Sequence, residues 1–170
     1  MTATFLDLVA TDHSPAPPAL KCPGDFMKAW GGIASLELSL AAVWTSSREE
    51  VSGLKAQVSE SLKGERSVSL ETSNLRVDLC SLTRWMSEAP ARLAGLHHRK
   101  GRIAPGYDAD LVVWDPDAAW TVDPSRLQQR HKVTPYAGRR LAARVQTTFL
   151  RGMPVWGDGR LIVGGSGRLL

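Results

Sequence analysis

An aspartate that directly follows an apolar segment is the residue of this sequence best placed to do chemistry. Asp12 comes after the nearly continuous apolar run 5–11 and opens the polar turn Asp12-His13-Ser14-Pro15. A carboxylate in that position can bind a metal ion or transfer a proton. Its structural alternative is to cap a turn before Pro15. The residue types alone favour neither role of Asp12 over the other.

A glycine pair marks a second stretch where a ligand has room to approach. Gly31 and Gly32 follow Trp30 and come after a proline-rich segment, residues 16–24. That proline content requires a loop, which we expect to lie over the end of the 5–11 segment. Paired glycines let the backbone come close to a ligand or simply turn the chain, and turning is the commoner use.

The segments around these residues predict an α/β fold. The run 5–11 is typical of a buried parallel strand that ends in a polar loop. Catalytic side chains of α/β barrels sit at the carboxyl ends of strands, which is where Asp12 falls. Residues 33–44 are apolar on nearly all sides and predict a buried helix. Apolar residues near helical spacing between 79 and 96, interrupted by Pro90, predict two short helices that meet at a kink.

The last third of the chain predicts strands instead of helices. Residues 110–115, 145–150 and 153–156 alternate or run apolar between turn residues, and the last two are separated by Arg151-Gly152. Three tryptophans are expected to pack in this small sheet, with indole N–H groups that need partners or solvent. They are Trp114, Trp120 and Trp156.

One stretch contributes little to a core. From about 46 to 78 the composition shifts to serine, glutamate, lysine and arginine, with sparse apolar residues. We interpret it as a polar surface insertion that carries no chemistry.

The composition excludes several functional classes. The net charge is +4 and the pI about 9.4, but the late basic residues alternate with apolar ones and match no nucleic-acid-binding motif. No apolar stretch approaches the ~20 residues of a membrane helix. The first residues lack the basic and apolar regions of a secretion signal, and Cys22 and Cys80 are the two cysteines. We therefore expect neither nucleic acid nor membrane as a partner, and a cytoplasmic location with the peroxisome as the alternative.

Four sequence blocks, in order, resemble those of allantoinases. They are Asp12-His13-Ser14-Pro15, Lys28-Ala29-Trp30-Gly31-Gly32-Ile33, Lys100-Gly101-Arg102-Ile103-Ala104-Pro105-Gly106-Tyr107-Asp108-Ala109-Asp110-Leu111-Val112 and Arg130-His131-Lys132-Val133-Thr134-Pro135-Tyr136-Ala137-Gly138-Arg139. The third block is shared by the wider amidohydrolase superfamily, and the other three narrow the resemblance to allantoinase. The stretch from about 46 to 78 falls outside it and looks longer than the family's usual connector.

The resemblance implies a fold and a site. The chain would be the C-terminal portion of a (β/α)₈ metal-dependent hydrolase barrel, residues 1–98, followed by the C-terminal strands of a small β-sandwich domain, residues 99–170. The family hydrolyses the cyclic amide of allantoin to allantoate in purine catabolism, using a binuclear zinc centre that acidifies the attacking water. Asp12 matches the eighth-strand aspartate that binds metal and passes the proton to the leaving nitrogen.

The resemblance has further implications for the loops and the assembly. Ser14, Gly31 and Gly32 fall where the family's loops line the substrate. Ala16 stands where allantoinases often place a cysteine, so the function of that side chain is absent or replaced. Family members are commonly oligomeric, so a homo-oligomer is expected.

The chief departure from the family lies in the metal ligands. A His-x-His pair, a carboxylated lysine and two further histidines lie upstream of the aspartate in the family, and eleven residues precede Asp12 here. The four histidines of this chain, at 13, 97, 98 and 131, do not replace them, and one aspartate does not hold zinc. We therefore expect a fragment that is inactive alone: a partial gene product, an alternative product or a decayed copy.

Two other functions remain open. One is a related cyclic amidohydrolase, such as a hydantoinase, dihydropyrimidinase or dihydroorotase. The other is a non-catalytic chain that associates with a homologous chain.

Overall fold

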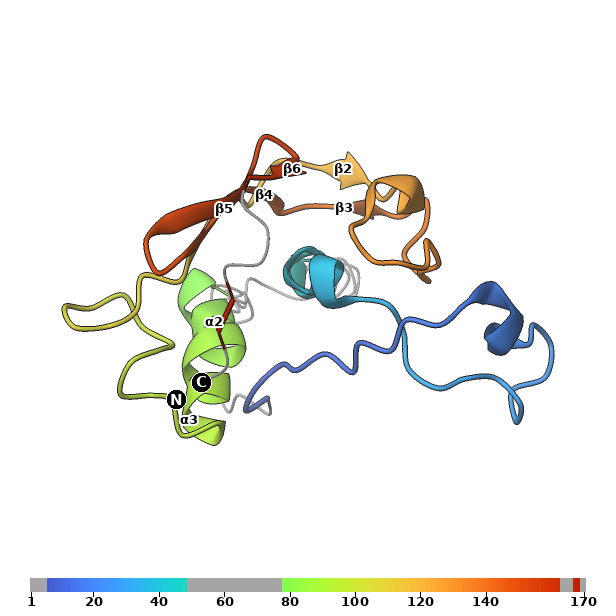
Figure 1. Ribbon diagram of the computed structural model, residues 1–170, viewed down its shortest axis with the longest axis horizontal. Coiled ribbons are helices and arrows are strands. Elements are labelled where there is room, and N and C mark those ends of the chain that lie inside the picture. Colours follow the sequence, from blue (N-terminus) through green and yellow to red (C-terminus); the bar gives the residue numbers. More distant parts are fainter. Residues whose placement is uncertain (1–5, 49–77, 163–166, 169–170) are drawn as a thin grey trace, which may run out of the picture.

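The computed structural model describes residues 6–48, 78–162 and 167–168 (Figure 1). Helices and strands are both present, which confirms the mixed α/β character expected from the sequence. Most of the stretch from about 46 to 78 lies outside the described residues, so its interpretation as a polar insertion stays a prediction. Within the described residues, no helix has the length and apolar character needed to cross a membrane.

The segment before Asp12 does not form the expected strand. Residues 6–12 have no regular secondary structure, and the Leu6 side chain is 43% exposed. A buried parallel strand needs neighbours that complete its backbone hydrogen bonds. In the described part of the chain no strand runs beside 6–12, although the Val9 N–H donates to the Trp85 carbonyl at 3.0 Å. The expectation of a buried strand is therefore wrong for these residues in this structure.

The predicted buried helix forms, but starts later than expected. A short 3₁₀ turn, η2 (Leu36–Leu38), leads into an α-helix over residues 39–48. Leu38, Ala41 and Trp44 are buried at a spacing of three residues, which places them on one helix face.

The second helical region is continuous where two helices with a kink were expected. α2 (Leu79–Thr83) runs through a π-helical turn, η4 (Arg84–Glu88), into α3 (Ala89–Leu93). Pro90 has no N–H, and its ring would collide with the carbonyl four residues earlier in an ordinary α-helix. The wider turn, in which the Ala89 N–H reaches the Arg84 carbonyl, lets the helix pass the proline without breaking.

The strands form an antiparallel sheet and a separate pair. The sheet has the order β1-β4-β5-β6, with β1 (Leu111–Asp115), β4 (Arg144–Leu150), β5 (Met153–Gly157) and β6 (Arg160–Leu161). β2 (Trp120–Thr121) pairs with β3 (Arg140–Leu141). The three strands expected in the last third are confirmed. Arg151 and Gly152 both have positive φ, as a two-residue hairpin turn requires.

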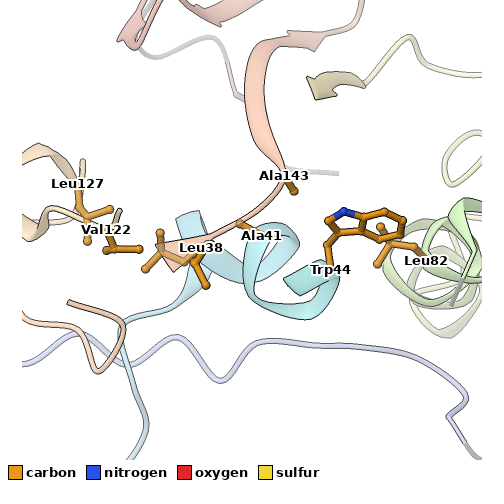
Figure 2. Close-up of a cluster of buried hydrophobic side chains, with 8 residues drawn as sticks. Leu38, Ala41, Trp44, Leu82, Val122, Leu127 and Ala143 are labelled. Atoms are coloured by element: carbon orange, nitrogen blue, oxygen red, sulfur yellow. The ribbon is translucent and has the colours of Figure 1, made fainter. Parts of the chain in front are cut away.

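One hydrophobic cluster joins helical and strand regions (Figure 2). We call residues 111–161, which contain all the strands described above, the β region. The helix 39–48 lies at the centre of the cluster, between Leu82 of α2 and residues of the β region. The buried members are Leu38, Ala41, Trp44, Leu82, Val122, Leu127, Leu141 and Ala143. The cluster draws on both sides of the division expected after residue 98, and that division stays a prediction.

Two of the three tryptophans expected in the sheet pack against this cluster. They are Trp114 and Trp120, whereas Trp156 is half-buried outside it. The indole N–H of Trp120 is buried and has no hydrogen-bond partner among the described residues, contrary to the expectation that each indole finds one or reaches solvent.

Candidate active-site loop

Asp12 presents an unused carboxylate. The residue is exposed, and among the described residues its side chain has neither a hydrogen bond nor an ion pair. A turn-capping aspartate would accept a backbone N–H two or three residues further on. Within the described residues, Asp12 therefore makes no turn-capping hydrogen bond, and its chemical role stays a prediction.

The two loops that carry the predicted site residues are held together at their ends. His13 and Ile33 form a parallel β-bridge, and the Ser14 N–H donates to the Ile33 carbonyl at 3.0 Å. The segment 14–33 is therefore closed into a loop at a point next to Asp12. We call residues 12–36 the active-site loop.

Gly32 brings the glycine pair against Asp12 and Ser14. Its φ is +71°, and an added Cβ would lie 2.5 Å from the Ser14 Cβ and 3.4 Å from the Oδ2 of Asp12. A side chain at position 32 would therefore clash and strain the backbone. Gly31 differs, because an added Cβ there would meet nothing within 4 Å. Three of the four predicted site residues thus lie in contact, with Gly31 adjacent in sequence.

Two side chains within the loop stabilise this arrangement. The Trp30 indole N–H donates to the Ser14 hydroxyl oxygen at 2.8 Å. The Lys21 ammonium donates to the carbonyl of Gly32 at 2.8 Å and to that of Trp30 at 3.2 Å. Sequence reasoning missed both, because neither residue type signals a partner nine to sixteen residues away.

His13 has a structural function that its sequence position did not reveal. Its Nδ1 accepts the backbone N–H groups of Ser35 and Leu36, each at 3.1 Å. These donors lie at the start of the helical segment, where backbone N–H groups lack partners within the helix. The Thr11 hydroxyl also lies 2.7 Å from the Ser35 hydroxyl. His13 thereby fixes the helix start against the segment that carries Asp12.

The block at 130–139 contacts the same loop from the β region. The buried Thr134 hydroxyl donates to the buried Ala34 carbonyl at 2.8 Å. Just outside the block and the loop, the Gln128 N–H donates to the Glu37 carboxylate at 2.7 Å. The three blocks specific to the resemblance therefore meet at the active-site loop.

The block at 100–112 instead forms an ion network elsewhere. Lys100 contacts both Asp108, at 3.0 Å, and Asp110, and Arg99 pairs with Asp108 at 2.9 Å. The hydrogen bond from Lys100, aided by Arg99, holds the pKa of the Asp108 carboxyl below its ordinary value. Burial acts to raise the pKa of Asp110, but hydrogen bonds from Lys100 and the Arg151 N–H outweigh it and lower the pKa. Hydrogen bonds to the two aspartates raise the pKa of Lys100. This network ties the segment after α3 to β1 and the β4–β5 turn.

The described residues do not form a metal site by themselves. Within those residues, no group of three or more histidine, cysteine, aspartate or glutamate side chains is arranged to hold a metal ion. A catalytic zinc ion normally has three protein ligands, and Asp12 can supply one of them. The assignment of Asp12 as a metal ligand stays a prediction.

Comparisons with known proteins identify relatives of this sequence. The family described as "Amidohydrolase family" matches residues 59–155. An allantoinase of Streptomyces avermitilis is 44% identical over 154 residues, which cover 91% of this chain and 28% of the relative. An allantoinase of Arabidopsis thaliana is 36% identical over 159 residues, covering 91% of this chain and 26% of the relative. The chain thus spans little more than a quarter of the length of these relatives.

Solved structures share the fold of the chain. The L-hydantoinase (dihydropyrimidinase) from Arthrobacter aurescens matches with a TM-score of 0.69 and 30% identity, over 92% of this chain and 30% of that chain. The D-hydantoinase (dihydropyrimidinase) from a Thermus species matches with a TM-score of 0.69 and 27% identity, over 92% of this chain and 29% of that chain. Both matches cover nearly the whole of this chain.

Proposed function

The chain belongs to the amidohydrolase family, and on this premise we propose that it acts within an allantoinase, which hydrolyses the cyclic amide of allantoin to allantoate in purine catabolism. The observation that carries the proposal is the closure of the active-site loop, which brings Asp12, Ser14 and Gly32 together. The allantoinase names of relatives up to 44% identical support the choice of substrate.

In this proposal the chain is the C-terminal portion of a (β/α)₈ barrel with the last strands of a small β-sandwich domain. Residues 6–12 then pair as a strand with neighbours supplied by the rest of the barrel. The absence of a strand neighbour for this segment within the described residues, with one backbone hydrogen bond from Val9 to Trp85, is consistent with a strand whose neighbours come from the rest of the barrel. The TM-scores of 0.69 to hydantoinases support the same arrangement.

The roles of the site residues follow from their contacts. Asp12 would bind metal and, through its exposed carboxylate, carry the proton to the leaving nitrogen of the ring. The Ser14 oxygen accepts from Trp30, which leaves its hydroxyl hydrogen to donate to the substrate. The backbone at Gly31 and Gly32 lies beside both groups and would line the ring. A binuclear zinc centre, when complete, supplies an acidified water, and its other ligands must come from outside the described residues.

The related cyclic amidohydrolases are the second candidate. The observation that favours them is the likeness to hydantoinases at up to 30% identity. The homo-oligomer, the cytoplasmic location and the alternative of a non-catalytic chain that associates with a homologue remain predictions of the sequence.

The proposal is tested on the product of the complete transcript, starting with the sequence upstream of Met1. We expect a His-x-His strand, a lysine and two further histidines in the same frame. The purified product is then assayed with allantoin, hydantoin, dihydrouracil and dihydroorotate, and we expect turnover of allantoin. Faster turnover of another ring would assign the chain to an enzyme of that substrate class instead. A transcript that starts at Met1 would contradict the proposal.

Asp12→Ala tests the catalytic assignment. We expect turnover to vanish with the fold intact, because the carboxylate has no partner among the described residues. The matched control is Asp7→Ala, an exposed aspartate of the same segment. Retained activity in Asp12→Ala would remove Asp12 from the site.

A further inference from the structure

We propose that Thr134 is a positioning residue for the active site, which sets the backbone of the active-site loop from the β region. For its catalytic consequence this inference rests on the proposed function. Its structural consequence is independent of that function.

The contact joins two buried groups that lie far apart in sequence. The Thr134 hydroxyl donates to the Ala34 carbonyl at 2.8 Å across a separation of 100 residues. Both residues are buried, so water does not replace either partner. The same hydroxyl oxygen accepts the Tyr136 N–H at 3.4 Å, which orients its hydrogen toward Ala34.

Ala34 lies between the two ties that close the loop. The residue before it, Ile33, accepts the Ser14 N–H, and the residues after it, Ser35 and Leu36, donate to His13. A change in the peptide plane of Ala34 therefore acts on both ties at once. Both ties end on His13 and Ser14, the two residues directly after Asp12, so the conformation at Ala34 sets the backbone at Ser14 and Gly32 that is proposed to line the substrate.

If Thr134 only stabilised the fold, its loss would affect the whole chain equally. Thr45 is a second threonine against which this possibility can be tested. The Thr45 hydroxyl donates to Ala41 at 2.7 Å and accepts the Ala142 N–H at 2.8 Å. Thr45 thus joins the same helical segment to the β region, but at the end distant in sequence from Asp12. Removing the Thr134 hydroxyl costs a buried hydrogen bond and removing the Thr45 hydroxyl a part-buried one, and of the two threonines Thr134 is the one that contacts the active-site loop.

The test compares backbone hydrogen exchange in Thr134→Val, Thr134→Ser and Thr45→Val. The reporter amides are those of Ser14, Ser35 and Leu36, and the reference amides lie in the central strand β4. We expect Thr134→Val to accelerate exchange of the reporters about tenfold relative to the reference, since a buried carbonyl loses its donor. Thr134→Ser keeps the hydroxyl and should stay near the wild type.

The control decides between positioning and general stability. Thr45→Val should leave the ratio of reporter to reference exchange unchanged. Equal acceleration in Thr45→Val, or wild-type exchange of the reporters in Thr134→Val, would overturn the proposal.

The catalytic arm uses the active complete protein. We expect Thr134→Val to raise KM for allantoin about tenfold with kcat changed less than about threefold, because the substrate-lining backbone is displaced while Asp12 remains. Thr134→Ser should restore KM. A loss confined to kcat would contradict the positioning role. Absence of turnover in the wild type would instead contradict the proposed function, with the exchange result still deciding the role of Thr134.

Discussion

Gly32 shows at the scale of one residue how tightly the loop is built. We expect Gly32→Ala to destabilise the chain by more than the ~1–2 kcal/mol cost of a left-handed backbone, because the new Cβ also clashes with Ser14. Gly31→Ala is the matched control, since its Cβ meets nothing within 4 Å and should change stability by less than about 1 kcal/mol. Urea unfolding midpoints measure both, and equal midpoints would contradict the close approach at Gly32.

Lys21 tests whether the closed loop depends on its side-chain contacts. In Lys21→Met the carbonyls of Trp30 and Gly32 lose a charged donor, so the loop should open more often. Phe26, which is 91% exposed, is a cleavage site for chymotrypsin within the loop. We expect cleavage there to accelerate about fivefold, as loss of ~1 kcal/mol of hydrogen bonding implies.

Lys28→Met is the control for this experiment. Lys28 pairs with Asp25 at 3.0 Å, and its side chain is 78% exposed, so its ion pair contributes little. Cleavage at the wild-type rate in Lys21→Met, or an equal rise in Lys28→Met, would exclude the role of Lys21.

At this scale the sequence pointed to candidate site residues and missed the contacts that hold them. Asp12, Ser14 and Gly32 were singled out by their blocks and lie close together, while their roles stay predictions. The contacts of His13 and Thr134 were not predictable, because a histidine or threonine side chain satisfies a backbone group anywhere within reach. Which group it finds depends on the folded path of the chain.

At the scale of elements, short-range patterns predicted the β region well. Strands β1, β4 and β5 appeared where alternation and turn residues placed them, and β4 and β5 form a hairpin, which neighbouring residues specify. The prediction of a strand over 5–11 was wrong for the opposite reason, because a parallel strand depends on neighbours remote in sequence. Pro90 was recognised as an interruption, but whether a helix breaks or widens depends on packing that local sequence does not specify.

The ion network that anchors β1 predicts a pH dependence. The pKa values of Asp108 and Asp110 are lowered from 3.8, so their stabilisation is present above that pH and is lost as the pH falls through the folded values. The pKa of Lys100 is raised from 10.5, so its stabilisation is present below that pH and is lost only as the pH rises through the folded value. The network is therefore fully formed between about pH 5 and pH 10.

Lys100→Met measures this dependence. We expect a lower urea midpoint than the wild type at pH 7, with the difference shrinking as the pH falls below about 4, where the aspartates take up protons. Lys28→Met serves again as the exposed control. A difference that stays constant down to pH 2.5 would show that Lys100 acts through packing and not through its charge.

At the scale of the whole molecule, the helix 39–48 follows the active-site loop and packs in the cluster that also contains Leu82 of α2 and residues of the β region. Trp44 is buried in the common cluster, stacks edge-to-face on Trp114 with ring centroids 5.5 Å apart, and donates its indole N–H to the Pro116 carbonyl at 2.9 Å. Trp44→Ala should cost about 3–5 kcal/mol, as for other large aromatic residues removed from a core.

Which amides lose protection from hydrogen exchange in Trp44→Ala is more informative than the size of the stability loss. If one cluster supports both regions, the amides of Ser35 and of β4 should lose protection together in Trp44→Ala. Leu93→Ala, at a side chain 78% exposed, should leave both unchanged. Loss of protection in β4 alone would show that the two regions fold separately.

The closure of residues 14–33 by the His13–Ile33 bridge also has an evolutionary consequence. Because both ends are tied, the entropic penalty for a longer tip grows only with the logarithm of its length. Phe26 and Met27 at the tip are almost fully exposed and contribute nothing to the core. Under the proposed function, insertions and substitutions there can accumulate while Asp12 stays in place, so selection can alter the choice of ring without rebuilding the proposed catalytic group.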